Sequence, residues 1–356
     1  MDFKSIPAID SHVHLYNKDC IDSFIKYRTD NNFTAVNVAC LCNLDAQMEN
    51  DPAQNILAAI IKLRDEHFYA HCGLVYPKFP VEKPIPAAYD FAEQIDELWK
   101  MGFDGFKMLE SKPTVRKLTG IPVCDEVFDG VYEYLQANDI PVVSHVADPE
   151  TFWDKDKAPE FSFAEGWFYG DGTFETKEAI YAEVGRVVEK YPAVRFTFPH
   201  FFFLSDDPAR ARKFLDDHPN ICFDITPGRE MYDNFTRHYD ETRSLFMDYY
   251  RRIMFGTDTS VRYFAGNESA MIEAIKRFLT TTDSFVFEDW GFDMKGLGLP
   301  GDVSRAILHD NFLCRVGKTP RKIDRKALAR YIEKRGEGVR DEATKVYIYD
   351  FAEKEL

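Results

Sequence analysis

The chain has 356 residues, and its content of 45% hydrophobic and 29% charged residues is typical of a globular protein rather than a disordered or fibrous one. Acidic side chains outnumber basic ones by 60 to 44, and the resulting net charge of −16 disfavours nucleic acids and anionic membranes as partners. No apolar run approaches the roughly 20 residues of a membrane helix, no signal peptide opens the chain, and seven scattered cysteines without a C-x-x-C pair indicate reduced thiols in a cytoplasmic protein.

Short β-type runs alternate with helical runs almost from end to end. The expected strands are 6–14, 33–40, 68–76, 103–109, 140–146, 194–200, 220–226 and 252–258. Apolar residues at helical spacing predict helices at 53–66, 90–101, 126–138, 177–190, 208–217 and 267–279. Alternation of this kind predicts a parallel sheet, and eight such units favour a closed (β/α)₈ TIM barrel over an open sheet.

Three stretches depart from this alternation. Residues 147–176, after the fifth strand, hold Trp153 and Trp167 among many aromatics, so we interpret them as a lid or pocket wall. The alternative is packing on the outer helices or on a second subunit. Residues 280–300 form a second break, and the charged tail at 317–356 is expected to pack outside the barrel. We therefore predict one barrel domain at 1–316 with a C-terminal extension at 317–356.

Metal-binding or titratable side chains gather at the ends of the predicted strands. Active sites of TIM barrels lie at the carboxyl ends of their strands. His12 and His14 end the first strand, and their spacing of two puts both on one side of it. The other strand-end groups are Lys107, His145, His200 and Asp258. Each alone is weak evidence, but together they predict one active-site rim.

Histidine and carboxylate ligands suit a divalent transition metal. We expect one ion, with Zn²⁺ favoured and Mn²⁺, Fe²⁺ and Co²⁺ as alternatives. Such an ion lowers the pKa of a bound water and makes it a nucleophile. A neighbouring histidine or aspartate must then move the protons.

The strand-end motifs resemble those of a known family. They are A-I-D-S-H-V-H-L at 8–15, G-F-K-M at 105–108, V-V-S-H at 142–145, F-P-H at 198–200, F-G-T-D at 255–258 and L-H-D-N-F-L-C-R at 308–315. In this order they resemble the amidohydrolase superfamily, specifically the amidohydrolase 2 branch related to aminocarboxymuconate semialdehyde decarboxylase. The resemblance covers about residues 6–316.

The resemblance implies a role for each matching residue. His12, His14 and His145 are similar to the metal ligands of the family. Asp258 resembles the carboxylate that both binds the metal and shuttles a proton. His200 resembles the histidine that positions or deprotonates the water in decarboxylase-like members, and that binds a second metal in other amidohydrolases.

Substrate contacts are expected from Lys107, Arg229, Tyr232, Trp153 and Trp167. We favour Lys107 as a free amine facing an anionic group; the alternatives are a carbamylated bridge between two ions and a lysine that only extends from the barrel end. Arg229 and Tyr232 follow the seventh strand, where Arg229 could bind a carboxylate or form a surface salt bridge.

These residues lead to three hypotheses about function. The first is a metal-dependent hydrolase acting on an amide, lactone or related bond of a small organic acid. The second is non-oxidative decarboxylation of a small aromatic or unsaturated carboxylic acid. The third is a barrel that binds a ligand without catalysis. In each case the expected partner is a small, anionic molecule, and homo-oligomerisation is left open.

Overall fold

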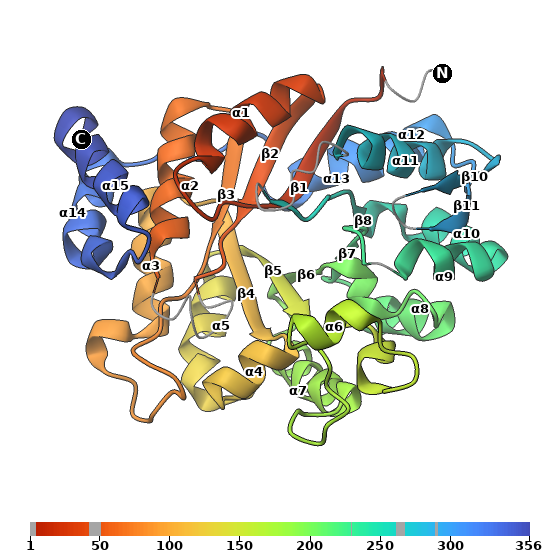
Figure 1. Cartoon of the computed structure of the whole chain (residues 1–356), viewed down its shortest axis with the longest axis horizontal. Helices are drawn as coiled ribbons and strands as arrows, with labels where there is room; N and C mark the ends of the chain where they lie inside the picture. Colours follow the sequence, from red (N-terminus) through yellow and green to blue (C-terminus); the bar gives the residue numbers. More distant parts are fainter. Residues whose placement is uncertain (1–4, 43–50, 229, 261–267, 289–290) are drawn as a thin grey trace.

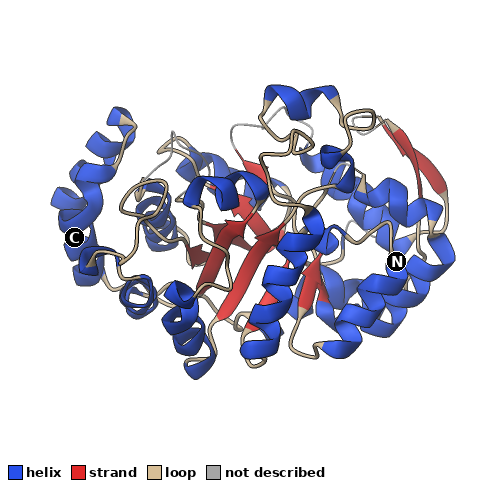
Figure 2. Ribbon diagram, turned by 90° about the horizontal axis from the view of Figure 1, so that it is seen from below, coloured by secondary structure: helices blue, strands red, loops and turns tan. Residues whose placement is uncertain are grey.

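The computed structural model describes residues 5–42, 51–228, 230–260, 268–288 and 291–356. Parallel strands lie in the order β8-β7-β6-β5-β4-β3-β2-β1-β9, and helices surround them (Figures 1 and 2). The strands are β1 (Ala8–His14), β2 (Phe33–Ala39), β3 (Phe68–Cys72), β4 (Gly105–Ser111), β5 (Pro141–Val146), β6 (Arg195–Phe198), β7 (Cys222–Asp224), β8 (Ile253–Met254) and β9 (Thr259–Ser260). All eight predicted strands are present.

The barrel closes through the segment that contains β8 and β9. β8 pairs with β7, whereas β9, a few residues later, pairs with β1. Between these pairings, Ser11 N donates to Phe255 O at 3.2 Å and Asp258 N donates to His12 O at 2.9 Å. One continuous segment therefore joins the last strand to the first, and the predicted TIM-barrel fold is confirmed.

Most helices follow the strands as the sequence predicted. They are α1 (Cys20–Asp30), α2 (Ala53–Arg64), α3 (Phe91–Met101), α4 (Pro113–Thr119), α5 (Asp129–Ala137), α6 (Glu160–Ala164), α7 (Lys177–Lys190), α8 (Pro208–Asp217), α9 (Met231–Arg237), α10 (Tyr239–Tyr249), α11 (Glu268–Thr280), α12 (Gly301–Arg305), α13 (Asn311–Arg315), α14 (Arg325–Arg335) and α15 (Glu342–Glu355). The start of α3 is capped by the Asp90 side chain, which accepts a hydrogen bond from Glu93 N, and its end is turned by Gly102 at a φ of 116°. Within the described part of the chain, no helix has the length and apolar character to cross a membrane.

The three departures from the alternation have structures of their own. The insertion at 147–176 contains a 3₁₀ turn at Glu150–Trp153 and the short helix α6. The break at 280–300 contains an antiparallel hairpin of β10 (Ser284–Phe287) and β11 (Phe292–Lys295). In the tail, α14 packs on α2 and α3, and α15 packs on α2 (Figure 1). The proposed domain boundary at 316 stays a prediction.

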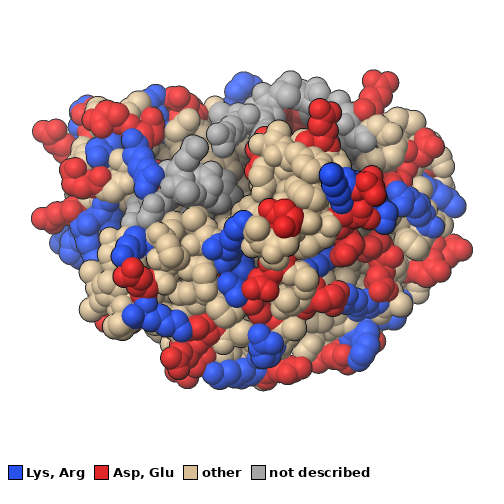
Figure 3. All heavy atoms as spheres, turned by 60° about the horizontal axis from the view of Figure 1, so that its bottom comes forward, with Lys and Arg blue, Asp and Glu red and all other residues tan. Residues whose placement is uncertain are grey.

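The two ends of the barrel differ in chemistry. At the amino ends of the strands, a buried apolar cluster that includes Ile9, Ala35, Tyr69 and Phe312 fills the interior. Towards the carboxyl ends, polar side chains such as His12, Lys107 and His200 are also buried. On the outer surface displayed in Figure 3, basic side chains are interspersed with acidic ones instead of gathering in one patch. The side chains able to bind a metal or transfer a proton therefore lie at the carboxyl ends of the strands.

Gly105 is the first residue of β4. The buried imidazole of His71 fills the space that a side chain at position 105 would need. A Cβ at Gly105 would overlap His71 Cδ2 and Nε2 and lie 2.7 Å from Pro141 O. Asn37 Nδ2 holds the same ring by a hydrogen bond of 2.6 Å to His71 Nδ1, so the ring has little freedom to move. We expect Gly105→Ala to lower the free energy of unfolding in urea by about 1–3 kcal/mol, as overpacked cores do.

Gly185, inside α7, provides the matched control. A Cβ there would meet nothing within 4 Å. Gly185→Ala should raise the free energy of unfolding by about 0.5–1 kcal/mol, because alanine is the better helix former. A Gly105→Ala variant as stable as the wild type would contradict the close approach of His71.

Candidate metal centre

His12 and His14 are held in place by Asp10, two residues earlier on β1. The buried Asp10 carboxylate accepts hydrogen bonds from His12 N at 3.2 Å, from Tyr27 Oη at 2.7 Å and from Thr257 Oγ1 at 2.6 Å. These bonds tie β1 to the segment that carries Asp258. The first strand and the closing segment therefore present their side chains to the same place.

His12, His14 and Asp258 form a group of potential metal donors. One nitrogen or oxygen of each lies within 4.8 Å of the others, and among the described residues these three are the group with that geometry. His14 Nε2 lies 2.9 Å, and His12 Nε2 3.8 Å, from Asp258 Oδ1. Asp258 has a φ of 59°, a left-handed conformation that non-glycine residues adopt rarely and mainly where function or packing demands it.

Hydrogen bonds behind the imidazoles decide which nitrogen faces inward. His14 Nδ1 lies 2.6 Å from Ala39 O, His12 Nδ1 lies 3.4 Å from Asp224 Oδ2, and His200 Nδ1 lies 3.1 Å from Thr226 O. Because each Nδ1 faces an acceptor, Nε2 is the nitrogen directed inwards in each ring, towards Asp258 Oδ1 for His14 and towards Lys107 Nζ for His12. Metal-ligating histidines are oriented in this way, so the residues present fit a metal.

His200 begins a turn with an unusual backbone. Residues 200–203 all have positive φ values, between 48° and 57°, which costs energy for non-glycine residues. Packing holds the turn in place: Tyr181 Oη donates to Phe202 O at 2.7 Å, and the rings of Phe201 and Phe202 are buried. The His200 ring centroid consequently lies 6.1 Å from that of His12 and 5.0 Å from that of His145.

His145 lies beside this group but is turned differently. Its Nε2 lies 2.9 Å from Ala147 O and 3.4 Å from Asp148 Oδ1. In this orientation Nδ1 is the nitrogen left to act as a ligand. The predicted metal-binding role of His145 therefore stays a prediction, and the structure places the residue next to the three donors without including it among them.

Burial controls the charges of the remaining groups. It lowers the pKa of His200 and of His145 to about 4, so both imidazoles are neutral at pH 7 and able to accept a proton. Lys107 Nζ lies 3.0 Å from His12 Nε2, and burial lowers its pKa to about 8, against the opposing effect of Asp258. Burial raises the pKa of Asp258, but the hydrogen bond with His14 and the nearby imidazoles outweigh it and hold the pKa well below its usual range.

A cavity of about 220 Å³ opens over these groups. Trp167, from the insertion, lines it, and its role in substrate contact stays a prediction. The lining residues are His12, His14, Tyr16, Leu41, Lys107, Leu109, Lys112, Thr114, His145, Glu165, Trp167, His200, Asp258 and Ser260.

Two predicted contact residues do not line this cavity, and a third lies outside the described part of the chain. Trp153 and Tyr232 do not line it: Trp153 Nε1 donates to Glu175 O at 3.0 Å, and the fully buried Tyr232 donates to Ile225 O at 2.9 Å. Arg229 lies outside the described residues.

A family model described as amidohydrolase matches residues 9–311, which is most of the chain and includes every potential donor above. The protein belongs to the amidohydrolase family. The predicted family is thereby confirmed, and this amidohydrolase is an enzyme from a family whose members are generally metal-dependent. No curated protein matches the chain in sequence.

Solved structures share the fold of this amidohydrolase at low sequence identity. The 5-carboxyvanillate decarboxylase of Sphingomonas paucimobilis is 10% identical, with 88% of this chain and 99% of that chain covered and a TM-score of 0.53. The 4-oxalomesaconate hydratase of Rhodopseudomonas palustris is 13% identical, covering 93% and 99% with a TM-score of 0.52. A probable 2-pyrone-4,6-dicarboxylic acid hydrolase of Acinetobacter baumannii is 11% identical, covering 87% and 98% with a TM-score of 0.52.

The structure adds residues to the site of this amidohydrolase that the sequence reasoning missed. Asp224 ends β7, accepts from His200 N at 3.1 Å and faces His12 Nδ1. Lys112 follows β4 directly and lines the cavity. Both stand at or just past a strand end, so the rule that found His145 and His200 would also have found them if applied to the seventh strand and to the residue after the fourth.

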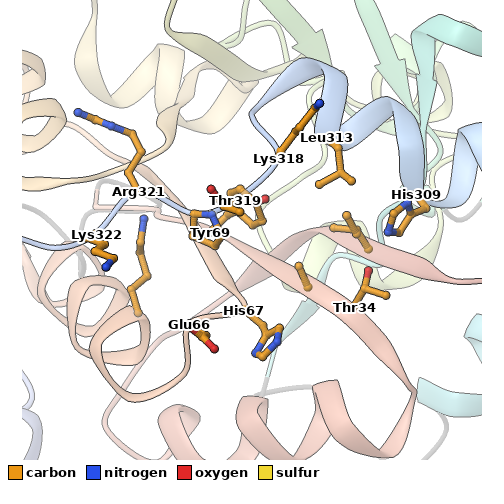
Figure 4. A pocket seen from close by; sticks show the side chains of 14 residues that line it. Thr34, Glu66, His67, Tyr69, His309, Leu313, Lys318, Thr319, Arg321 and Lys322 are labelled. Atoms are coloured by element: carbon orange, nitrogen blue, oxygen red, sulfur yellow. The ribbon is translucent and has the colours of Figure 1, made fainter.

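A second cavity, of about 560 Å³, lies at the opposite end of the barrel (Figure 4). It contains basic residues, but Lys62 donates to Asp104 and Gly102 O, and Arg321 donates to the carbonyl oxygens of Trp99 and Phe103. Figure 4 shows the Arg321 guanidinium directed away from the centre of the cavity. These groups brace the loop at the amino ends of the strands, so the smaller cavity is the candidate active site of this amidohydrolase.

Proposed function

We propose that this amidohydrolase is a metal-dependent hydrolase that acts on an amide, lactone or related bond of a small organic acid. The observation that carries the proposal is the group of His12, His14 and Asp258 beside His200, with Nδ1 of each histidine against an acceptor and Nε2 directed inwards. This arrangement supports both ligation and proton transfer in one cavity. Histidines that only stabilise the fold would not require Nε2 of all three rings to face one cavity.

His12, His14 and Asp258 are the residues we propose to hold the ion, with His145 as a further ligand. Two or three imidazoles and one carboxylate suit Zn²⁺, while Mn²⁺, Fe²⁺ and Co²⁺ accept the same ligands. When bound, such an ion supplies a water of lowered pKa, which is a nucleophile at neutral pH.

The protein's own groups must move the protons. His200 is neutral because burial lowers its pKa to about 4, and its Nε2 is free to accept a proton from the attacking water. Asp258 is ionised, because its pKa is held well below its usual range, so its carboxylate can take that proton from His200 and pass it to the leaving group. The Lys107 amine, with its pKa of about 8, adds positive charge where an anionic substrate would lie.

Decarboxylation is the second candidate. It is favoured by the fold shared with a 5-carboxyvanillate decarboxylase, which presents a comparable barrel. In that reaction the same cavity would bind the carboxylate to be lost, and the carbon left behind would take a proton from water, relayed by His200 or Asp258. The metal donors are common to both reactions, so the substrate distinguishes them.

The test is turnover of metal-replete protein on a defined panel. Amides, lactones including 2-pyrone-4,6-dicarboxylate, and aryl carboxylates including 5-carboxyvanillate are scored for added water and for released CO₂. We expect water addition without CO₂. Release of CO₂ alone would establish the second candidate, and a metal-loaded protein that converts none of these compounds would refute the proposal.

The insertion offers a separate prediction. Because Trp167 lines the cavity and Trp153 does not, Trp167→Ala should raise KM about tenfold through the loss of one aromatic contact, with bound metal unchanged. Trp153→Ala is the matched control and should change KM less. If both variants altered only thermal stability or oligomer size, the insertion would be an interface or a brace, not a pocket wall.

A further inference from the structure

Lys112 is a buried cation in the wall of the active-site cavity. It is the residue after β4 and is only 6% exposed, yet it lines the cavity together with Lys107. Lys107 lies at the metal donors, 3.0 Å from His12. Lys112 instead faces the insertion. The proposed function gives Lys112 no role, although removing an ammonium from water is costly unless it has partners.

The partners of Lys112 leave one side of it open to the cavity. Its Nζ donates to Asp148 Oδ1 at 3.0 Å and to Oδ2 at 2.8 Å, and it lies 4.7 Å from the centre of the Trp167 ring. An ammonium has three N–H groups, and the carboxylate of Asp148 engages two of them. The third has no hydrogen-bond acceptor among the described residues, and Lys112 lines the cavity.

Asp148 connects this cation to the insertion. Besides Lys112 it accepts a hydrogen bond from Tyr169 Oη at 2.6 Å and faces His145 Nε2 at 3.4 Å. Asp148 and Tyr169 both belong to the insertion, and both are buried. The position of Trp167 over Lys112 is thus braced by a network that begins beside His145.

We propose that Lys112 is the residue that selects a planar carboxylate on the substrate, with Trp167 covering the ring or chain that bears it. This inference rests on the proposed function and deepens it by naming the substrate class. Asp148 already offsets most of the charge of Lys112, which suits a singly charged carboxylate better than a dianionic phosphate. Glu165 and Asp258 also line the cavity and would repel an anion. The favourable positions for the substrate carboxylate are therefore those next to Lys107 and Lys112.

Binding of isophthalate (benzene-1,3-dicarboxylate) to the purified protein tests this directly, by calorimetry and by tryptophan fluorescence. Isophthalamide, which has the same shape without charge, is the comparator ligand. We expect isophthalate to bind at least about tenfold more tightly than isophthalamide, the difference typical of one charge-assisted hydrogen bond. Fluorescence quenching by isophthalate should be lost in Trp167→Phe.

The variants separate charge recognition from loosening of the insertion. Lys112→Met should lose the preference for isophthalate, and Lys112→Arg should keep it. Because Lys112→Met leaves Asp148 without its ion-pair partner, the double variant Lys112→Met/Asp148→Asn repeats the test with both charges removed.

Lys117→Met is the matched control. Lys117, on α4, also contacts the insertion, since its Nζ lies 2.6 Å from Thr173 Oγ1 and 3.9 Å from the centre of the Phe174 ring, but it does not line the cavity. It should bind isophthalate as the wild type does.

Each outcome decides the proposal independently of turnover. Wild-type protein that does not distinguish isophthalate from isophthalamide, or a double variant that still does, would overturn the role of Lys112. A loss of the preference in Lys117→Met equal to that in Lys112→Met would also overturn it. Binding that depends on Lys112, in a protein that converts none of the panel, would leave this inference standing while refuting the proposed hydrolase.

Discussion

Replacing His12 and His14 together by alanine is expected to reduce bound transition metal from about one ion per chain to near zero, because each replacement removes a direct ligand. In the structure both imidazoles direct Nε2 towards Asp258 Oδ1, at 2.9 Å for His14 and 3.8 Å for His12. The measurement is elemental analysis of protein dialysed after loading with Zn²⁺. Activity should disappear with the metal.

The control for this experiment is His67→Ala, since His67 is half-exposed and pairs with Asp65 far from the active-site cavity. It should retain the metal of the wild type. Retention of metal by the double variant would show that the ion binds elsewhere. Two ions per wild-type chain would point to the alternative in which Lys107 is carbamylated and bridges them.

The second large effect is expected from His200→Asn. This variant should keep its metal but lose about 10²–10⁴-fold in kcat, the range typical of a general acid-base group. The neutral imidazole that burial maintains, with a pKa of about 4, is a proton acceptor at Nε2, and an amide is not. Asparagine tolerates the left-handed backbone of this position, where φ is 56°, so the turn should survive the change.

His67→Asn controls for the substitution itself and should be as active as the wild type. Metal content separates the possible roles of His200. If His200→Asn lost metal together with activity, His200 would be a ligand, and the site would be of the binuclear type. Unchanged kcat with full metal would assign the proton transfer to another group, such as Asp258.

The barrel and most of its rim were predictable because they follow from local rules. Alternating apolar strands and amphipathic helices determine the fold, and parallel strands point their carboxyl ends to one side. A histidine or aspartate at such an end is therefore brought to the rim whatever its distance in sequence. His12, His14, His200 and Asp258 were found in this way.

What the sequence did not reveal depends on backbone conformations without a residue signature. Ala147 has a φ of 60°, rare for alanine, and its carbonyl lies 2.9 Å from His145 Nε2, which leaves Nδ1 as the nitrogen that could bind a metal. The pairing of Lys112 with Asp148 likewise depends on how the insertion folds back over β4. Neither feature could be inferred from composition or spacing.

The donor group lies on the seam where the first and last strands of the barrel meet. His14 and Asp258 are 244 residues apart, and they come together only when the segment at 253–260 pairs with β1. Contacts of such long sequence separation form late in folding. The site is therefore absent from a growing or partly assembled chain, and an ion that binds it stabilises the completed ring alone. Metal uptake by this chain should thus report closure of the barrel.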